Sequence, residues 1–310
     1  MHQNLKSSLL THLNHLALDI GERNLSNPGS LEASARYIEE IFAQTGLEPQ
    51  RQQFNFEGTN FANVEVLVPC SNKGTSAEHQ ATNETQVSNE TQETIVIGAH
   101  YDTVKDSPGA NDNGTGIAAI LALAHILKDC QPKRNIRLVA FANEESPYFA
   151  GDGMGSLNYA RACKGRGERV VAMYSLETMG YFSKEPGSQK YPPGVSGYPS
   201  TGNFIAFVAN IKSTALLEET KMIFQEQSNF PFQTIAAPES TPGVSLSDHM
   251  CFWQMDYPAI MVTDTAPFRY PHYHTAEDTP DKVDLDMFTE LVDNLGKTFA
   301  ALAGTRAKRL

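Results

Sequence analysis

Residues 94–102 read TIVIGAHYD, an apolar run that ends in a histidine and an aspartate. A short, continuous apolar run of this kind is typical of a β-strand buried on both faces of its sheet. Similar runs recur at residues 136–142, 170–176, 204–208 and 259–262. Helical patterns lie between several of them, and strands that alternate with helices predict a three-layer α/β/α sandwich with a predominantly parallel sheet.

The rest of the chain fits this architecture. Helical periodicity covers residues 9–20, 31–41, 114–127, 154–163, 213–227 and 285–302. Residues 63–68 alternate between polar and apolar side chains, which indicates a first strand, placed at a sheet edge by its half-polar character. Residues 71–93 carry almost no large apolar side chain and are expected to form a flexible polar loop. We therefore expect a single domain over residues 1–310 that is interrupted by this loop.

The composition limits the partners and the compartment. The chain has 24 Lys and Arg residues and 36 Asp and Glu residues, which gives a formal net charge of −12. Nucleic-acid binding needs clustered basic residues, so we expect no nucleic-acid partner. The first 24 residues contain no continuous apolar stretch, so we expect no signal peptide, no membrane span and a cytoplasmic protein. The four cysteines are widely spaced, which favours buried thiols over disulfides or metal ligands.

Side chains that can bind metal gather near the ends of the predicted strands. They are His100, Asp112, the pair Glu144 and Glu145, Glu177, and a histidine at 272 or 274. Each has an ordinary interpretation alone, as a buried core histidine, a helix-capping turn or a solvated strand end. Binding sites of open α/β sheets form beyond the carboxyl ends of strands, so together these residues predict a metal centre.

The residue types indicate zinc and a hydrolytic site. Two imidazoles and three carboxylates are nitrogen and oxygen ligands that suit zinc, and one bridging acid would let five side chains bind two ions. One of Glu144 and Glu145 would then remain free to act as a general base. Asp102 shares a side of its strand with His100, so it could accept the second ring N–H and fix the tautomer that binds metal.

Seven motifs occur in an order that resembles the co-catalytic zinc aminopeptidases and their relatives, the glutamate carboxypeptidases and glutaminyl cyclases. These motifs are HYD at 100–102, ANDNGTG at 110–116, NEE at 143–145, MGS at 154–156, LETMGY at 176–181, SDH at 247–249 and HYHTAEDT at 272–279. The resemblance covers nearly the whole chain outside residues 71–93. It implies the phosphorylase/hydrolase-like α/β/α fold, with a mixed, mostly parallel sheet of about eight strands.

The resemblance also implies roles for single residues. It makes His100 and Glu177 ligands of one zinc ion, and Glu145 and His274 ligands of a second, with His272 as the alternative to His274. Asp112 becomes the bridging ligand, followed by a cis peptide bond to Asn113, and Glu144 becomes the general base. Many relatives have aspartate where this chain has Glu177.

The activity implied is that of an aminopeptidase, which hydrolyses the N-terminal bond of a peptide that has a free N-terminus. Asp248, Tyr148 and Phe149 are candidates for the substrate pocket, and Asp248 could instead cap a short helix. Two alternatives remain: a glutaminyl cyclase-like acyltransferase that uses a single zinc ion, and a binding module on the same fold without catalysis. The MGS motif and residues 275–281 resemble the peptidases more than the cyclases. The complete set of ligands and the spare acid argue against a module without catalysis.

Overall fold

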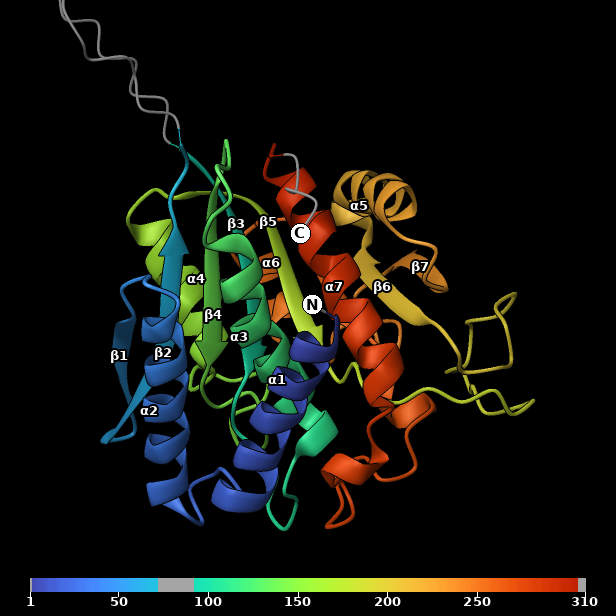
Figure 1. The fold of residues 1–310 in the computed structure, drawn as a ribbon, viewed down its shortest axis with the longest axis horizontal. Helices are drawn as coiled ribbons and strands as arrows, with labels where there is room; N and C mark the ends of the chain where they lie inside the picture. Colours follow the sequence, from blue (N-terminus) through green and yellow to red (C-terminus); the bar gives the residue numbers. More distant parts are fainter. Residues whose placement is uncertain (1, 72–91, 306–310) are drawn as a thin grey trace, which may run out of the picture.

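The computed structural model describes residues 2–71 and 92–305, which contain a twisted eight-stranded sheet (Figure 1). The strands lie in the order β1-β2-β4-β3-β5-β8-β6-β7. Their bounds are β1 Gln50–Phe56, β2 Thr59–Val68, β3 Glu93–His100, β4 Asn135–Phe141, β5 Arg169–Glu177, β6 Ile205–Asn210, β7 Phe232–Ala237 and β8 Ala259–Thr263. The pairs β4–β3, β3–β5, β5–β8 and β6–β7 are parallel and the other three are antiparallel, so the sheet is mixed.

Helices cover both faces of the sheet, which gives the three layers that the sequence predicts (Figure 1). The helices are α1 His2–Asn14, α2 Pro28–Gln44, α3 Gly116–Leu127, α4 Gly155–Gly165, α5 Thr214–Gln227, α6 His249–Gln254 and α7 Leu285–Leu302. Short π-helical or 3₁₀ turns lie at η1 His15–Ile20, η2 Ala110–Thr115, η3 Ile211–Ser213, η4 Ala266–Phe268 and η5 Pro280–Lys282. None of the helices in the described residues is long and apolar enough to cross a membrane.

The core consists of two apolar layers, one on each face of the sheet. The larger layer packs the inward sides of α1, α2, α3, α5 and α7 on the sheet, and α3 is buried along nearly its whole length. The smaller layer lies under α4 and α6 and includes Phe141, Phe252 and Trp253. Strands that are covered by an apolar layer on each face of the sheet are buried throughout, as in β6 and β8. This burial explains why their sequences read as continuous apolar runs.

Two strands escape prediction from the sequence, and one is placed wrongly. Neither β1 nor β7 is predicted, because both lie at sheet edges and their sequences, QRQQFNF and FQTIAA, are largely polar or mixed. The predicted edge position for residues 63–68 is wrong, since β2 lies between β1 and β4. Its polar Glu65 is accommodated inside the sheet by an ion pair with Arg137 of β4, at 2.9 Å.

The polar loop predicted at residues 71–93 falls mostly outside the described residues. Its ends are held, because the Ser71 N–H donates to the Pro132 carbonyl at 2.7 Å and Glu93 begins β3. The strands β3, β4, β5 and β8 run parallel, so their carboxyl ends all lie at the same end of the sheet. The connections that follow them therefore converge there, and they carry the residues described next.

Candidate metal centre

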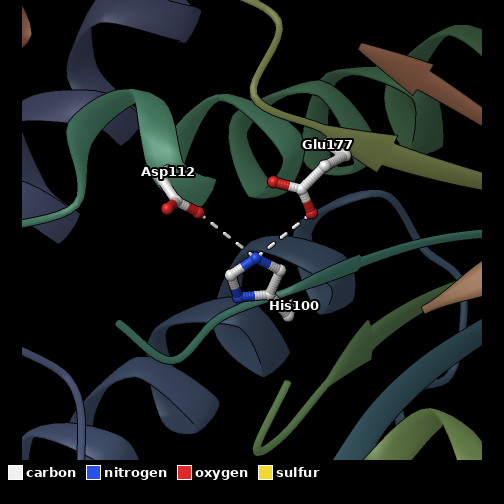
Figure 2. Close-up of side chains that lie close together, drawn as sticks. All are labelled: His100, Asp112 and Glu177. Atoms are coloured by element: carbon white, nitrogen blue, oxygen red, sulfur yellow. Dashed lines mark ion pairs between the residues drawn. The ribbon is translucent and has the colours of Figure 1, made fainter. Parts of the chain in front are cut away.

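His100, Asp112 and Glu177 meet at the carboxyl ends of β3 and β5 (Figure 2). His100 Nε2 lies 3.4 Å from Asp112 Oδ1 and 3.3 Å from Glu177 Oε2, and all three side chains are buried. His100 and Glu177 are the last residues of their strands, and Asp112 lies in η2, which leads into α3. Burial opposes a charged imidazole, but Glu177 and the other carboxylates outweigh it and raise the pKa of His100.

A second group of potential ligands shares Asp112 with the first. His274 Nε2 lies 3.0 Å from Asp112 Oδ2 and 3.3 Å from Glu145 Oε1. Asp112 thus turns one carboxylate oxygen toward each histidine, which is the arrangement that a carboxylate bridging two ions requires. Although burial opposes it, hydrogen bonding to His100 and His274 lowers the pKa of Asp112, so this acid is ionised.

Glu145 provides a direct test of whether the donors fit a metal. Its Oε1 atom is buried and makes no hydrogen bond among the described residues, although His274 Nε2 lies 3.3 Å away. Leaving a buried carboxylate oxygen unpaired is costly, so native proteins pair such atoms or coordinate them to metal. The mixture of imidazole and carboxylate donors also suits zinc better than calcium or magnesium, which prefer oxygen ligands alone. The residues present therefore fit zinc.

Glu144 lies beside the first group of potential ligands, and it also forms a third possible group with His100 and Glu145. Its Oε2 atom is 3.9 Å from His100 Nε2, farther than the Asp112 and Glu177 oxygens. Burial, together with the negative charges of Glu145 and Glu177, raises the pKa of Glu144 well above its usual value, although His100 opposes the shift. A carboxyl group with a raised pKa next to a metal centre is suited to take up and return a proton.

Asp102 supports both halves of the centre. His100 Nδ1 lies 3.1 Å from the backbone carbonyl oxygen of Asp102 and 3.5 Å from its Oδ1 atom. The carboxylate of Asp102 also accepts the backbone N–H groups of Glu144 and Glu145, each at 3.0 Å. The backbone carbonyl of Asp102 is therefore nearer to His100 than the carboxylate that was predicted to contact it. The carboxylate instead accepts the hydrogen bonds of the turn that carries both glutamates.

The backbone around Asp112 is held by residues to which the sequence assigns no role. The peptide bond between Asp112 and Asn113 is cis, as predicted. Asp278 accepts the backbone N–H groups of Asn111 and Asp112 at 2.8 and 3.0 Å. Asn113 donates to the Leu176 carbonyl at 2.8 Å. Asn111, Asn113 and Asp278 all lie inside the motifs ANDNGTG and HYHTAEDT, so the motifs were the signal that could have found them.

The structure separates the two candidate histidines of the last motif. His274 points at Asp112 and Glu145, whereas His272 Nδ1 pairs with Glu277 at 2.9 Å. The ring of Tyr273 stacks on that of His274, with centroids 3.8 Å apart and planes 19° apart. The geometry therefore places His274, and not His272, in the group of potential ligands.

Glu177 is held by a serine of the SDH motif. Ser247 Oγ donates to Glu177 Oε2 at 2.8 Å and also lies 2.8 Å from Ser175 Oγ. The next residue, Asp248, is fully buried at the start of α6, but its side chain makes no capping hydrogen bond there. The short helix expected after Asp248 is therefore present without a side-chain cap. Burial raises the pKa of Asp248 to about 7.

An apolar pocket opens beside Glu177. Its walls come from β6, β7 and β8, from the segments between β5 and β6 and between β7 and α6, and from the loop after β8. They include Tyr191, Tyr198, Phe204, Ile235, Val244 and Phe268. Tyr273 lies at the junction of this pocket with the ligand group. The three predicted pocket residues do not line it: Asp248 is buried, Tyr148 packs on Phe56 and Phe61, and Phe149 packs near Met154 and Cys251.

Comparison with known proteins identifies the family. The model of "Peptidase family M28" matches residues 81–299. The chain belongs to peptidase family M28. Among curated relatives of this M28 peptidase, the uncharacterized protein YfbL of Escherichia coli is 33% identical over 292 residues, which are 91% of this chain and 83% of the relative. A probable leucine aminopeptidase of Arthroderma otae is 29% identical over 214 residues, and the matched region spans 64% of this chain and 50% of the fungal protein.

Solved structures share the fold of this M28 peptidase. BSAP, a zinc aminopeptidase from Bacillus subtilis, superposes with a TM-score of 0.71 at 14% identity and covers 98% of this chain and 96% of its own. A glutaminyl cyclase from Porphyromonas gingivalis gives a TM-score of 0.67 at 17% identity, with 96% and 98% covered. The family and the α/β/α fold implied by the sequence motifs are therefore confirmed.

Proposed function

We propose that this M28 peptidase is a di-zinc aminopeptidase that removes the N-terminal residue from peptides. The observation that carries this proposal is the geometry of Asp112, which presents one oxygen to each of two groups of ligands. His100 and Glu177 would hold one zinc ion, Glu145 and His274 the other, and Asp112 both. Zinc bound there would supply a Lewis acid and a water molecule whose pKa falls from ~15.7 toward ~7.

Glu144 is the general base in this proposal. Its carboxylate would accept a proton from the attacking water and return it to the leaving amine, which conserves the proton within one turnover. Two features of the chain prepare Glu144 for this role. Asp102 fixes the backbone of the turn that carries it, and burial favours the protonated form that must exist between the two transfers.

The apolar pocket is the proposed site for the side chain of the N-terminal residue. It opens beside Glu177 and Tyr273, so a substrate bond placed at the metal centre could direct its first side chain into the pocket. Apart from Glu177, which is a ligand, the ionisable residues in the wall are Lys190 and tyrosines, and Lys190 is exposed. Such a wall favours uncharged, apolar side chains, because a buried charge would find no partner.

The described residues are also proposed to form one domain, because all five proposed ligands lie at the ends of the strands of a single sheet or in the connections that follow them. The glutaminyl cyclase reaction is the competing activity, and it is supported by the shared fold. The two groups of potential ligands that share Asp112 favour hydrolysis, since a site with one ion would leave one of them unused.

A substrate panel tests the proposed function. Aminoacyl-p-nitroanilides with leucine, phenylalanine, lysine and glutamate would be assayed beside an N-terminally blocked analogue and a glutaminyl peptide, with zinc content measured on the same sample. We expect hydrolysis of the apolar substrates, no cleavage of the blocked analogue, and close to two zinc ions per chain. Cyclisation of the glutaminyl peptide by a protein with one zinc ion per chain would overturn the proposal.

A further inference from the structure

Arg23 is a fully buried arginine outside every motif of the metal centre. Among the described residues its guanidinium group donates only to backbone carbonyl oxygens. The acceptors are Tyr101 at 2.8 Å, Leu16 at 3.1 Å, Gly21 at 3.1 Å, Pro108 at 2.7 Å and Gly109 at 2.8 Å. A buried guanidinium is costly unless its donors are paired, so this number of well-placed acceptors indicates a site that the fold builds for it.

The acceptors belong to two parts of the chain. Leu16 and Gly21 lie in and just after η1, whereas Tyr101, Pro108 and Gly109 lie in the connection between His100 and Asp112. Two further hydrogen bonds join the same parts. The Arg23 N–H donates to Thr103 Oγ1 at 3.0 Å, and the Thr103 N–H donates to the Arg23 carbonyl at 3.0 Å. Arg23 therefore joins the η1 region to the connection between His100 and Asp112, which has a proposed ligand at each end.

Gly109 shows how closely this connection fits around the arginine. Its φ of 61° lies in the left-handed region, and a Cβ atom added there would be 2.8 Å from Arg23 Nη2 and 2.3 Å from Thr103 Cγ2. The guanidinium also adds a positive charge near the buried carboxylates of Asp278, Asp102 and Asp112. Geometry and charge both link Arg23 to the backbone on which the bridging ligand depends.

We propose that Arg23 is a positioning residue that sets the metal affinity of the centre by holding the connection between His100 and Asp112. This inference rests on the proposed function, in which these two residues are ligands. Outer partners that orient ligands commonly change metal affinity about 10–100-fold when they are removed. Arg23 makes no hydrogen bond to the side chain of a proposed ligand among the described residues, so its hydrogen bonds act on the ligands through the backbone.

Arg269 offers a matched control, because it is a second buried arginine with a different task. It donates to Gln189 Oε1 and to the Phe204 carbonyl, both at 2.7 Å, and its guanidinium lies 4.5 Å from the centre of the Phe204 ring. Gln189 and Phe204 line the apolar pocket. Replacing Arg269 should therefore disturb the pocket wall, while replacing Arg23 should disturb the ligands.

The test compares Arg23→Lys with Arg269→Lys. Each lysine keeps the charge but has three donors, fewer than the five hydrogen bonds that Arg23 makes. The zinc affinity of the metal-free proteins would be measured by competition with a chromophoric chelator, alongside their thermal unfolding and their KM for leucine p-nitroanilide. We expect Arg23→Lys to weaken zinc binding at least tenfold with little change in KM at saturating zinc, and Arg269→Lys to raise KM with parental zinc affinity.

Distinct results separate the failure of this proposal from that of the proposed function. Parental zinc affinity in Arg23→Lys, or equal losses of affinity in both lysine variants, would overturn the positioning role alone. A parent protein that binds no zinc would overturn both proposals. Should Arg23→Lys not fold, Thr103→Val decides, since it removes the hydroxyl acceptor of the Arg23 N–H and keeps the side-chain shape. Unchanged zinc affinity in that variant would reject the proposal, and weaker binding would support it.

Discussion

Asp278 holds the backbone of Asp112, because its Oδ2 atom accepts the Asp112 N–H at 3.0 Å. Its Oδ1 atom accepts the neighbouring Asn111 N–H and the hydroxyl group of Tyr270. In Asp278→Asn one acceptor becomes an NH₂ group that faces a donor. We expect zinc affinity to fall about 10–100-fold, as for other partners that orient a ligand, measured by chelator competition. Asp281→Asn, three residues away and exposed, is the control and should bind zinc like the parent.

Substitutions of Glu144 and Glu145 should impair the enzyme in different ways. Glu144→Gln removes the proposed base but no proposed ligand, so the protein should keep its zinc and lose at least ~10²-fold in kcat. Glu145→Gln removes a proposed ligand, so its main effect should be weaker zinc binding. Zinc content and kcat measured on both variants distinguish the roles. Near-normal turnover by Glu144→Gln, or its loss of zinc, would contradict the assignment.

The layers of the fold, and the candidate ligands that the structure brings together, could be predicted from the sequence because both depend on local patterns. Buried strands read as continuous apolar runs, and His100 and Glu177 end two of those runs. Arg23 could not be found in this way. A single arginine resembles a surface residue until carbonyl groups from residues 16–21 and 101–109 surround it, and that arrangement exists only in the folded chain.

The apolar pocket was also beyond prediction, for a related reason. Its wall includes Tyr191 and Tyr198, from a segment between β5 and β6 without regular secondary structure, and Ile235 on the unpredicted edge strand β7. Such segments show no periodicity that could reveal which side chains face one another. Asp248 is a candidate as part of the SDH motif, and Tyr148 and Phe149 as part of the loop after the NEE motif. Neither relation indicates the side of the centre on which a side chain lies.

Ile235→Glu should redirect the choice of substrate. A carboxylate in the apolar wall disfavours leucine at the N-terminus and gives lysine or arginine a partner. We expect the ratio of kcat/KM for lysine over leucine p-nitroanilide to rise about tenfold or more, since a pocket change of this kind is worth about 1–3 kcal/mol. Ile211→Glu is the control, because Ile211 is exposed and lies outside the pocket. An equal change in the two variants would exclude the pocket as the site of selection.

Removal of metal should lower the thermal stability. Ions that bind only the folded state stabilise it by about 2.7 kcal/mol at a free concentration 100 times the Kd. We therefore expect Tm to fall by several degrees after dialysis against a chelator and to recover when zinc is added. Asp112→Asn, which weakens the proposed bridge with little change in shape, should show a much smaller shift. The same zinc-dependent rise in Tm in that variant would show that the ions bind elsewhere.

His12 should make folding sensitive to acid through a mechanism remote from the metal centre. Burial, with His125 and His15 nearby, lowers the pKa of His12 from its usual 6.5 to about 4, and its Nδ1 atom lies 2.7 Å from the Tyr37 hydroxyl. Between these two pKa values the unfolded chain binds the proton and the folded chain does not. The stability contributed by neutral His12 is therefore complete above pH 6.5 and declines as the pH falls toward 4.

His12→Gln isolates this contribution, because glutamine retains hydrogen-bonding groups but does not titrate. From urea unfolding, we expect the parent to lose about 2 kcal/mol more stability than the variant between pH 7.5 and pH 5. At pH 5 His12 is mostly protonated in the unfolded chain and mostly neutral in the folded chain. Using the difference between the two proteins at each pH removes the titration of every other group that they share, including the ligands. Equal pH dependence in the parent and the variant would mean that His12 takes up its proton in the folded state, and that the contact with Tyr37 accommodates a charged ring.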